Sequence, residues 1–176
     1  MHKIRKKTFE TNSSSVHTIT LNGSCENDLE VNEDGYVHLQ VRGYGREGAV
    51  YENAEDKLMY AILTVCYTNC IWIPWELCYL EEDEESDELV LVMEEWNNTI
   101  AELQENSEFH EIEQCVIKRM STESRTCNGI KFLPGYGCID HQSQEYYSLK
   151  DFLKSNQISS IEEFIFGKAV LITDSD

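Results

Sequence analysis

The stretch Glu55–Cys70 reads EDKLMYAILTVCYTNC, and it places the core helix around which the fold is built. Its apolar residues recur at the spacing of one helix face, at Leu58, Ala61, Ile62, Val65 and Cys66. Asn53 or Asp56 stands where it can cap the first turn. Pro74 predicts that the helix ends near Ile73, because the residue before a proline disfavours the helical region.

On either side of this helix, shorter segments show the patterns of strands and helices. The patterns predict strands at Val16–Leu21, Tyr36–Val41 and Lys168–Thr173, helices at Glu88–Asn106, Leu149–Leu153 and Ser160–Phe166, and a tight glycine-rich loop at Gly129–Cys138. The first two strands are candidates to pair with each other, and 109–118 fits either helix or strand. We therefore expect one α+β domain over 1–176, with helices packed on a small mixed or antiparallel sheet.

Acidic residues are concentrated in the middle of the chain. The formal charge of the 176 residues is −19, and the segment 51–113 contains 18 acids against one base, Lys57. That segment therefore carries −17 of the total. Crowding like charge in this way costs self-repulsion in the folded state, so we expect it to have a use.

The acidic segment combines a run of carboxylates with an amphipathic helix. The helix places Leu89, Val92, Trp96, Ile100 and Leu103 on one stripe and its glutamates off that stripe. Carboxylates one turn apart lie about 5–6 Å from each other, similar to neighbouring phosphates on a nucleic-acid strand. The candidate partner-binding residues are Glu81, Glu82, Asp83, Glu84, Glu85, Asp87, Glu88, Glu94, Glu95, Glu102 and Glu105.

Two interpretations of this surface are open, and two ligands, calcium and free nucleic acid, are disfavoured. The run 81–88 has no glycine turn and no calcium-loop register, which disfavours calcium. A solvated loop is the simplest interpretation of a like-charge block. The alternative is an array that imitates phosphates and occupies a Lys/Arg-lined channel on another protein. Free nucleic acid is disfavoured by the net charge, since only the tip Lys3–Lys7 is basic.

A second, catalytic hypothesis rests on His17, Asp140 and His141. An acid beside a histidine can act as base and orienter or as metal ligands, so convergence of the three would make a small hydrolase or a metal-dependent enzyme. Ser15 beside His17 lacks a nucleophile elbow and fits a turn better. The pair Cys66 and Cys70 lacks a second matching pair, so we expect no metal and no cofactor.

The sequence also indicates the compartment. No apolar region follows the basic start of the chain, so we expect no secretion signal. The apolar stretches at 61–65 and 71–75 are far shorter than the roughly 20 residues of a membrane span. Seven unevenly spaced cysteines indicate reduced thiols, and hence the cytoplasm.

Motifs toward the two ends of the chain resemble those of a known group of small proteins. FETNSSSVHTI at 9–19 and GCIDHQS at 137–143, with VLITDSD at 170–176, resemble small proteins of phages, prophages and their Gram-positive hosts that carry an ETNSSS-x-H signature and a DHQS motif. By class, such acidic proteins are similar to anti-CRISPR inhibitors of Cas9-type nucleases. The resemblance implies a phage-encoded, non-enzymatic DNA mimic in the bacterial host cell, whose partner is a nuclease or its guide complex, with a Lys/Arg-rich channel as target.

Overall fold

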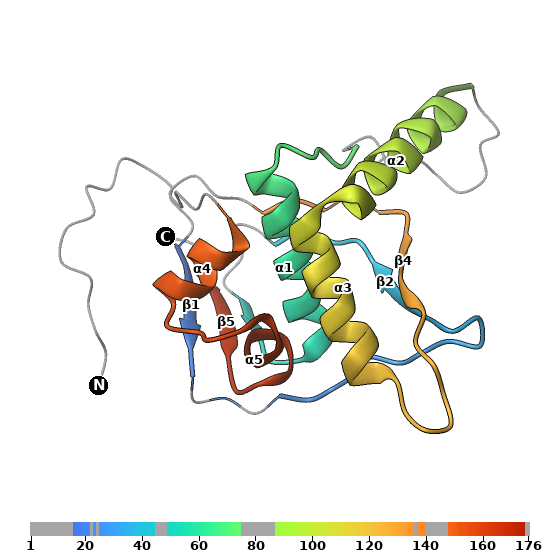
Figure 1. The fold of residues 1–176 in the computed structure, drawn as a ribbon. Coiled ribbons are helices and arrows are strands. Elements are labelled where there is room, and N and C mark those ends of the chain that lie inside the picture. Colours follow the sequence, from blue (N-terminus) through green and yellow to red (C-terminus); the bar gives the residue numbers. More distant parts are fainter. Residues whose placement is uncertain are drawn as a thin grey trace.

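The structure is a computed structural model that describes residues 16–21, 23, 25–44, 49–74, 87–135, 137–139 and 148–174. These residues form an α+β fold, as the sequence predicts (Figure 1). The helices are α1 Ala54–Thr68, α2 Asp87–Glu105, α3 Ser107–Met120, α4 Leu149–Ser155 and α5 Ile161–Phe166. The strands are β1 Val16–Thr20, β2 Tyr36–Gln40, β3 Ala49–Tyr51, β4 Gly129–Leu133 and β5 Val170–Asp174.

Helix α1 lies at the centre, and most of its side chains are buried. Asn53 caps it, since its side-chain oxygen accepts a hydrogen bond from the amide of Asp56 at 2.8 Å. The helix ends at Thr68, which corrects the predicted end near Ile73. Cys70 adopts a φ of 56°, and the amides that follow the helix return to the carbonyls of its last turn, which ends the helix before Pro74 has any effect.

The side chain of Lys57 ties α1 to the C-terminal part of the chain. Lys57 is fully buried, and its ammonium donates to the carbonyl of Gly167 at 3.1 Å and of Ala169 at 3.0 Å. Gly167 caps the end of α5, where unpaired carbonyls favour a cation. The only base of the acidic segment 51–113 is thus enclosed in the core and does not neutralise the surface.

The strands form two separate sheets on either side of α1 (Figure 1). β5 lies between β1 and β3 and is antiparallel to both, while β2 pairs only with β4, in parallel. The first two strands therefore do not pair with each other. The reason is positional, because α1 separates them and each finds its partner in the C-terminal half of the chain.

Strand β4 begins the segment that was predicted to be a tight loop. Gly129 has a φ of +146°, and a Cβ there would lie 2.6 Å from the Glu113 Oε1 atom. The same oxygen accepts the amide of Ile130 at 3.2 Å, so the glycine lets the strand start directly beneath the carboxylate. Val37, Leu39 and Ile130 point into the core from this sheet.

The remaining helices settle the ambiguous segment 109–118 and confirm the two short helices predicted near the C-terminus. The segment 109–118 belongs to helix α3, capped by Asn106 and buried through Phe109, Ile112 and Val116. α4 and α5 are short helices, as predicted, and Ser148 and Ser160 cap them. Among the residues described, no helix is both long enough and apolar enough to cross a bilayer.

We expect Lys57→Met to destabilise the fold by about 2–4 kcal/mol, because two buried carbonyls lose their donor and each unsatisfied group costs about 1–3 kcal/mol. Urea unfolding followed by circular dichroism measures the change. Lys154→Met, on the exposed face of α4, is the matched control and should unfold close to wild type. Equal stability of the two variants would contradict a structural role for Lys57.

Candidate functional site

The site is built on α2, which is amphipathic in the predicted register. Val92, Trp96 and Leu103 are buried, while Leu89 and Ile100 are partly exposed at the edges of the same stripe. Figure 1 shows that the helix packs on the body through its C-terminal half and that its N-terminal half projects from it. The face opposite the stripe is therefore open to solvent along much of the helix.

Glutamates line this outward face. Glu94, Glu95, Glu102 and Glu105 are all exposed. Glu95, Glu102 and Glu105 fall on one row, at a spacing of seven and then three residues, and Asn98 occupies the intervening turn. A rise of about 1.5 Å per residue puts about 10 Å between the first two and about 5 Å between the last two. The prediction that these carboxylates face outward is confirmed for these four side chains.

No cation balances the four glutamates within the described part of the chain. The ion pairs formed there join Asp34 to Lys131 and His38, Arg42 to Glu55 and Asp56, Lys150 to Glu111, and His110 to Glu113. None of these pairs involves a residue of α2. Lys57 is buried elsewhere, so among the residues that the structure describes no cation neutralises the charge of α2.

Apolar side chains lie next to this charge, and sequence reasoning did not single them out. Trp72 is 72% exposed, and its carbonyl accepts a hydrogen bond from the Thr99 hydroxyl at 3.1 Å. Val90 and Leu91, on the projecting part of α2, are 66% and 63% exposed. The sequence could have indicated the exposure of Val90 and Leu91, because both lie off the buried stripe of α2. The exposure of Trp72 had no signal in the sequence.

Other candidate residues lie partly or wholly outside the described chain. Glu81, Glu82, Asp83, Glu84 and Glu85 fall in the range 75–86, which the structure does not describe. Asp87 and Glu88 begin α2, but only their backbone is described. Of the predicted partner-binding residues, the structure therefore describes the side chains of Glu94, Glu95, Glu102 and Glu105 only.

The catalytic hypothesis is neither supported nor excluded. The backbone of His17 lies in β1 opposite Thr173, but its side chain is not described. Asp140 and His141 lie outside the described residues. The predicted convergence of these three residues therefore stays a prediction.

Cys66 and Cys70, near the end of the core helix, lie in two different environments. Cys66 is buried, and burial raises the pKa of its thiol to about 12. Cys70 is exposed at the left-handed position that ends the helix. No group of three or more metal-ligating side chains occurs among the described residues.

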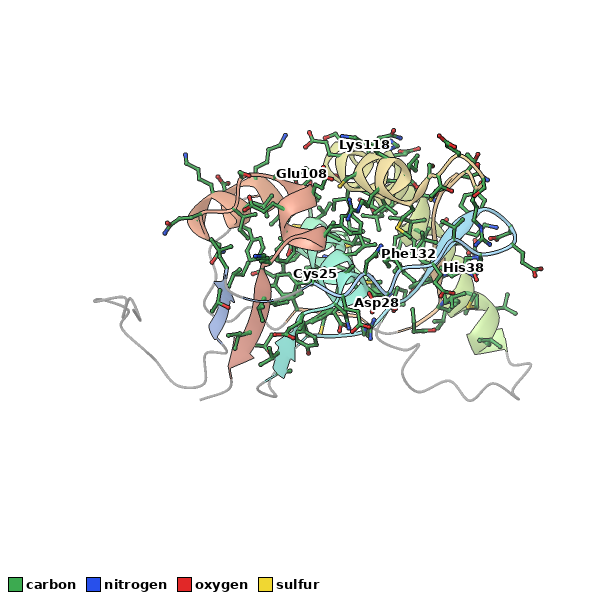
Figure 2. The ribbon with its side chains drawn as sticks, turned by 90° about the horizontal axis from the view of Figure 1, so that it is seen from below. Cys25, Asp28, His38, Glu108, Lys118 and Phe132 are labelled. Atoms are coloured by element: carbon green, nitrogen blue, oxygen red, sulfur yellow. The ribbon has the colours of Figure 1, made fainter. Side chains whose placement is uncertain are left out.

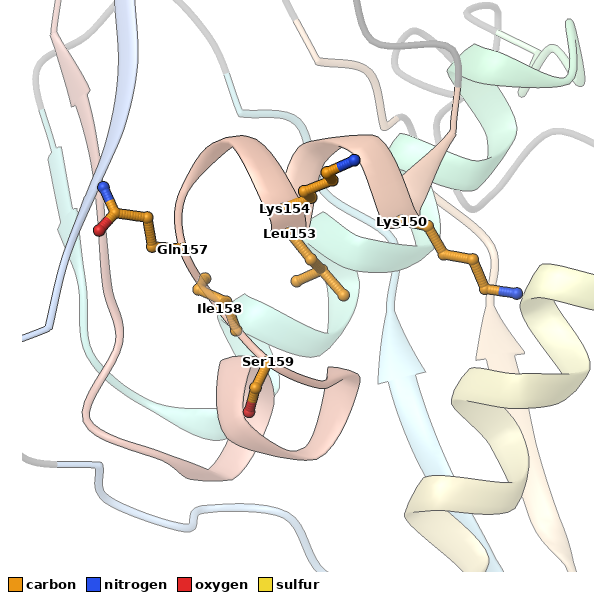
Figure 3. A pocket seen from close by; sticks show the side chains of 6 residues that line it. All are labelled: Lys150, Leu153, Lys154, Gln157, Ile158 and Ser159. Atoms are coloured by element: carbon orange, nitrogen blue, oxygen red, sulfur yellow. The ribbon is translucent and has the colours of Figure 1, made fainter.

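A hollow of about 450 Å³ lies beside α4 (Figure 3). It is lined by Lys150, Leu153, Lys154, Gln157, Ile158 and Ser159. The Lys150 ammonium lies 2.9 Å from the Glu111 carboxylate, which raises the pKa of Lys150. The Ser159 hydroxyl donates to Glu163. Both groups are thus engaged locally, and we assign this hollow no chemistry.

A comparison of the chain with protein-family models, curated proteins and solved structures gives no match.

We expect Cys70 and Cys138 to react quickly with iodoacetamide at pH 8, and Cys66 and Cys127 to react only after unfolding. The first two are exposed and the last two are buried, and burial keeps Cys66 in the unreactive thiol form. Peptide mass spectrometry after a timed pulse measures each site separately. Rapid labelling of Cys66 in the folded protein would contradict its placement in the core.

Proposed function

We propose that this protein is a non-enzymatic interaction protein that uses α2 to bind a Lys/Arg-rich surface on a nucleic-acid-handling protein. The observation that carries the proposal is the outward row of glutamates on α2, for which the described chain supplies no cation. Glu102 and Glu105 lie one turn apart, where like charges repel. A cationic partner removes that repulsion and releases the counterions that both surfaces hold.

Trp72 adds an exposed apolar side chain next to the acidic helix α2. Thr99, which holds the carbonyl of Trp72, is one helical turn from both Glu95 and Glu102. The backbone of Trp72 therefore lies next to the turns of α2 that carry these two carboxylates. An arginine of the partner can stack on the indole and bond a carboxylate with the same guanidinium. Tryptophan and arginine are the residue types that most often dominate binding energy at interfaces.

The spacing along α2 favours imitation of charge over imitation of phosphate geometry. A nucleic-acid strand carries a charge about every 3.4 Å of helix axis, whereas Asn98 interrupts the α2 row and leaves a gap of about 10 Å. We therefore assign recognition to individual Lys and Arg side chains.

The terminal motifs suggest the class of partner. The resemblance to phage and prophage proteins, and by class to anti-CRISPR inhibitors, supports a DNA-binding nuclease such as a type II CRISPR effector as the partner. Its PAM-reading and guide-duplex channels are rich in the cations that α2 would meet. The protein would then act in the bacterial cytoplasm without a cofactor.

The test replaces Glu94, Glu95, Glu102 and Glu105 together with lysine. Target-DNA cleavage by a Cas9–guide complex is measured with increasing amounts of wild type or variant, at 50 and 200 mM salt. We expect wild type to inhibit cleavage, with inhibition weakened about tenfold or more at the higher salt, because screening and counterion release act on the same contacts. The lysine variant should not inhibit.

The matched control changes four exposed glutamates away from α2 to lysine, which alters net charge equally. Glu26, Glu30, Glu33 and Glu123 serve this purpose, and none forms an ion pair in the described chain. The control should inhibit like wild type at matched salt. If both variants behave alike, net charge rather than α2 is responsible, and the proposed site is wrong. If wild type does not inhibit, the nuclease assignment is wrong.

A further inference from the structure

The N-terminal part of α2 carries more apolar residues than the buried face of a helix needs. The run Leu89–Met93 reads LVLVM, and five consecutive residues exceed one turn of 3.6 residues. Apolar side chains therefore point in every direction around the helix axis at this position. A helix segment of this kind is normally covered on all sides.

The described chain covers only the inner part of this turn. Val92 is buried, whereas Val90 and Leu91 are 66% and 63% exposed. Both lie on the part of α2 that projects from the body (Figure 1). These two side chains are thus apolar surface that a further molecule can cover.

Further along α2, the apolar side chains have neighbours in the body. Trp96 and Ile100 line a groove of about 360 Å³ together with His38 and Phe132, which belong to the sheet of β2 and β4. Figure 2 shows His38 and Phe132 close together on the side of the molecule where α2 lies. The sheet therefore serves the inner side of the helix, and the exposed pair near its N-terminus does not line this groove.

Negative charge borders the exposed pair. Glu94 is one turn from both Val90 and Leu91, Glu95 is one turn from Leu91, and both carboxylates are exposed. Two more acids stand just before the apolar run in the sequence. A second copy of this chain, with its net charge of −19, would bring its own acids against these. The charge therefore favours an occupant that combines apolar side chains with cations.

We propose that Val90 and Leu91 form the apolar contact of the interface, and that the partner meets them with a segment whose large apolar side chains are flanked by lysine or arginine. The cationic part of this inference rests on the proposed function, whereas the apolar part rests on the exposure of the two side chains. Burial of one such side chain strengthens binding by about tenfold or more. Salt screens the charge contacts but not this one.

The test compares two synthetic peptides on the full-length protein, labelled with ¹³C in its valine and leucine methyl groups. One peptide has two leucines between two pairs of lysines, and the other has serines in place of the leucines, so both carry the same charge. We expect the leucine peptide to shift the methyl resonances of Val90 and Leu91, and to bind about tenfold or more tightly than the serine peptide at 200 mM salt. The serine peptide should bind through charge alone, and its affinity should fall about tenfold or more between 50 and 200 mM salt.

The combined substitutions Val90→Gln and Leu91→Gln remove the apolar contact and keep every charge. Glutamine is a good helix former, so α2 should persist. The leucine peptide should then bind no more tightly than the serine peptide, whose affinity should not change. The matched control combines Val50→Gln with Leu21→Gln, because these apolar side chains are 62% and 43% exposed and lie away from α2. It should bind both peptides like wild type.

Three outcomes overturn the apolar contact alone: equal affinity of the two peptides with unmoved Val90 and Leu91 methyl resonances, a clearly lower urea midpoint of the double glutamine variant, or a wild-type dimer in sedimentation that this variant loses. The second would show that the chain itself covers the pair, and the third that a second copy does. In the first case, binding of both peptides leaves the proposed function standing. If neither peptide binds, α2 does not recognise cations, and both proposals are wrong.

Discussion

The ammonium of Lys57, bound to the carbonyls of Gly167 and Ala169, is the contact on which the rest of the structure depends. A lysine is rarely buried without partners, because removing its charge from water is costly. Here two carbonyls at the end of α5 replace the water. The contact joins α1 to the segment that leads into β5, and β5 in turn holds β1 and β3. This side chain therefore adds a polar link between the central helix and the antiparallel sheet to the apolar core that both share.

The same contact determines the character of the surface. Because Lys57 is enclosed, the only lysine or arginine of the segment 51–113 does not neutralise acids at the surface. The amphipathic pattern of α2 then turns four of those acids outward, and none has a cationic neighbour in the described chain. Trp72 adds a large apolar side chain to the same region. An exposed aromatic residue is more typical of an interface than of a surface adapted only to solubility.

The second sheet gives the acidic helix a neighbour of a different kind. β2 and β4 form a parallel pair, and a groove lies between α2 and this sheet, so neutral and apolar side chains of α2 line the groove while its described glutamates face solvent.

Sequence alone determined the features set by local chemistry. The periodicity of Glu55–Cys70 indicated the central helix, the stripe of α2 indicated the outward glutamates, and local patterns predicted the short helices at Leu149–Leu153 and Ser160–Phe166. Tertiary structure decided the features that join distant residues. Strand pairing depends on partners more than ninety residues away, as for Tyr36 and Gly129, and no local pattern encodes it. Gly129–Leu133 has the glycine of a loop, yet it forms a strand because it pairs with β2. The glycine leaves room for the carboxylate of Glu113, which would lie 2.6 Å from a Cβ. The burial of Lys57 and the exposure of Trp72 were hidden for the same reason, since both depend on which groups meet only after the chain has packed.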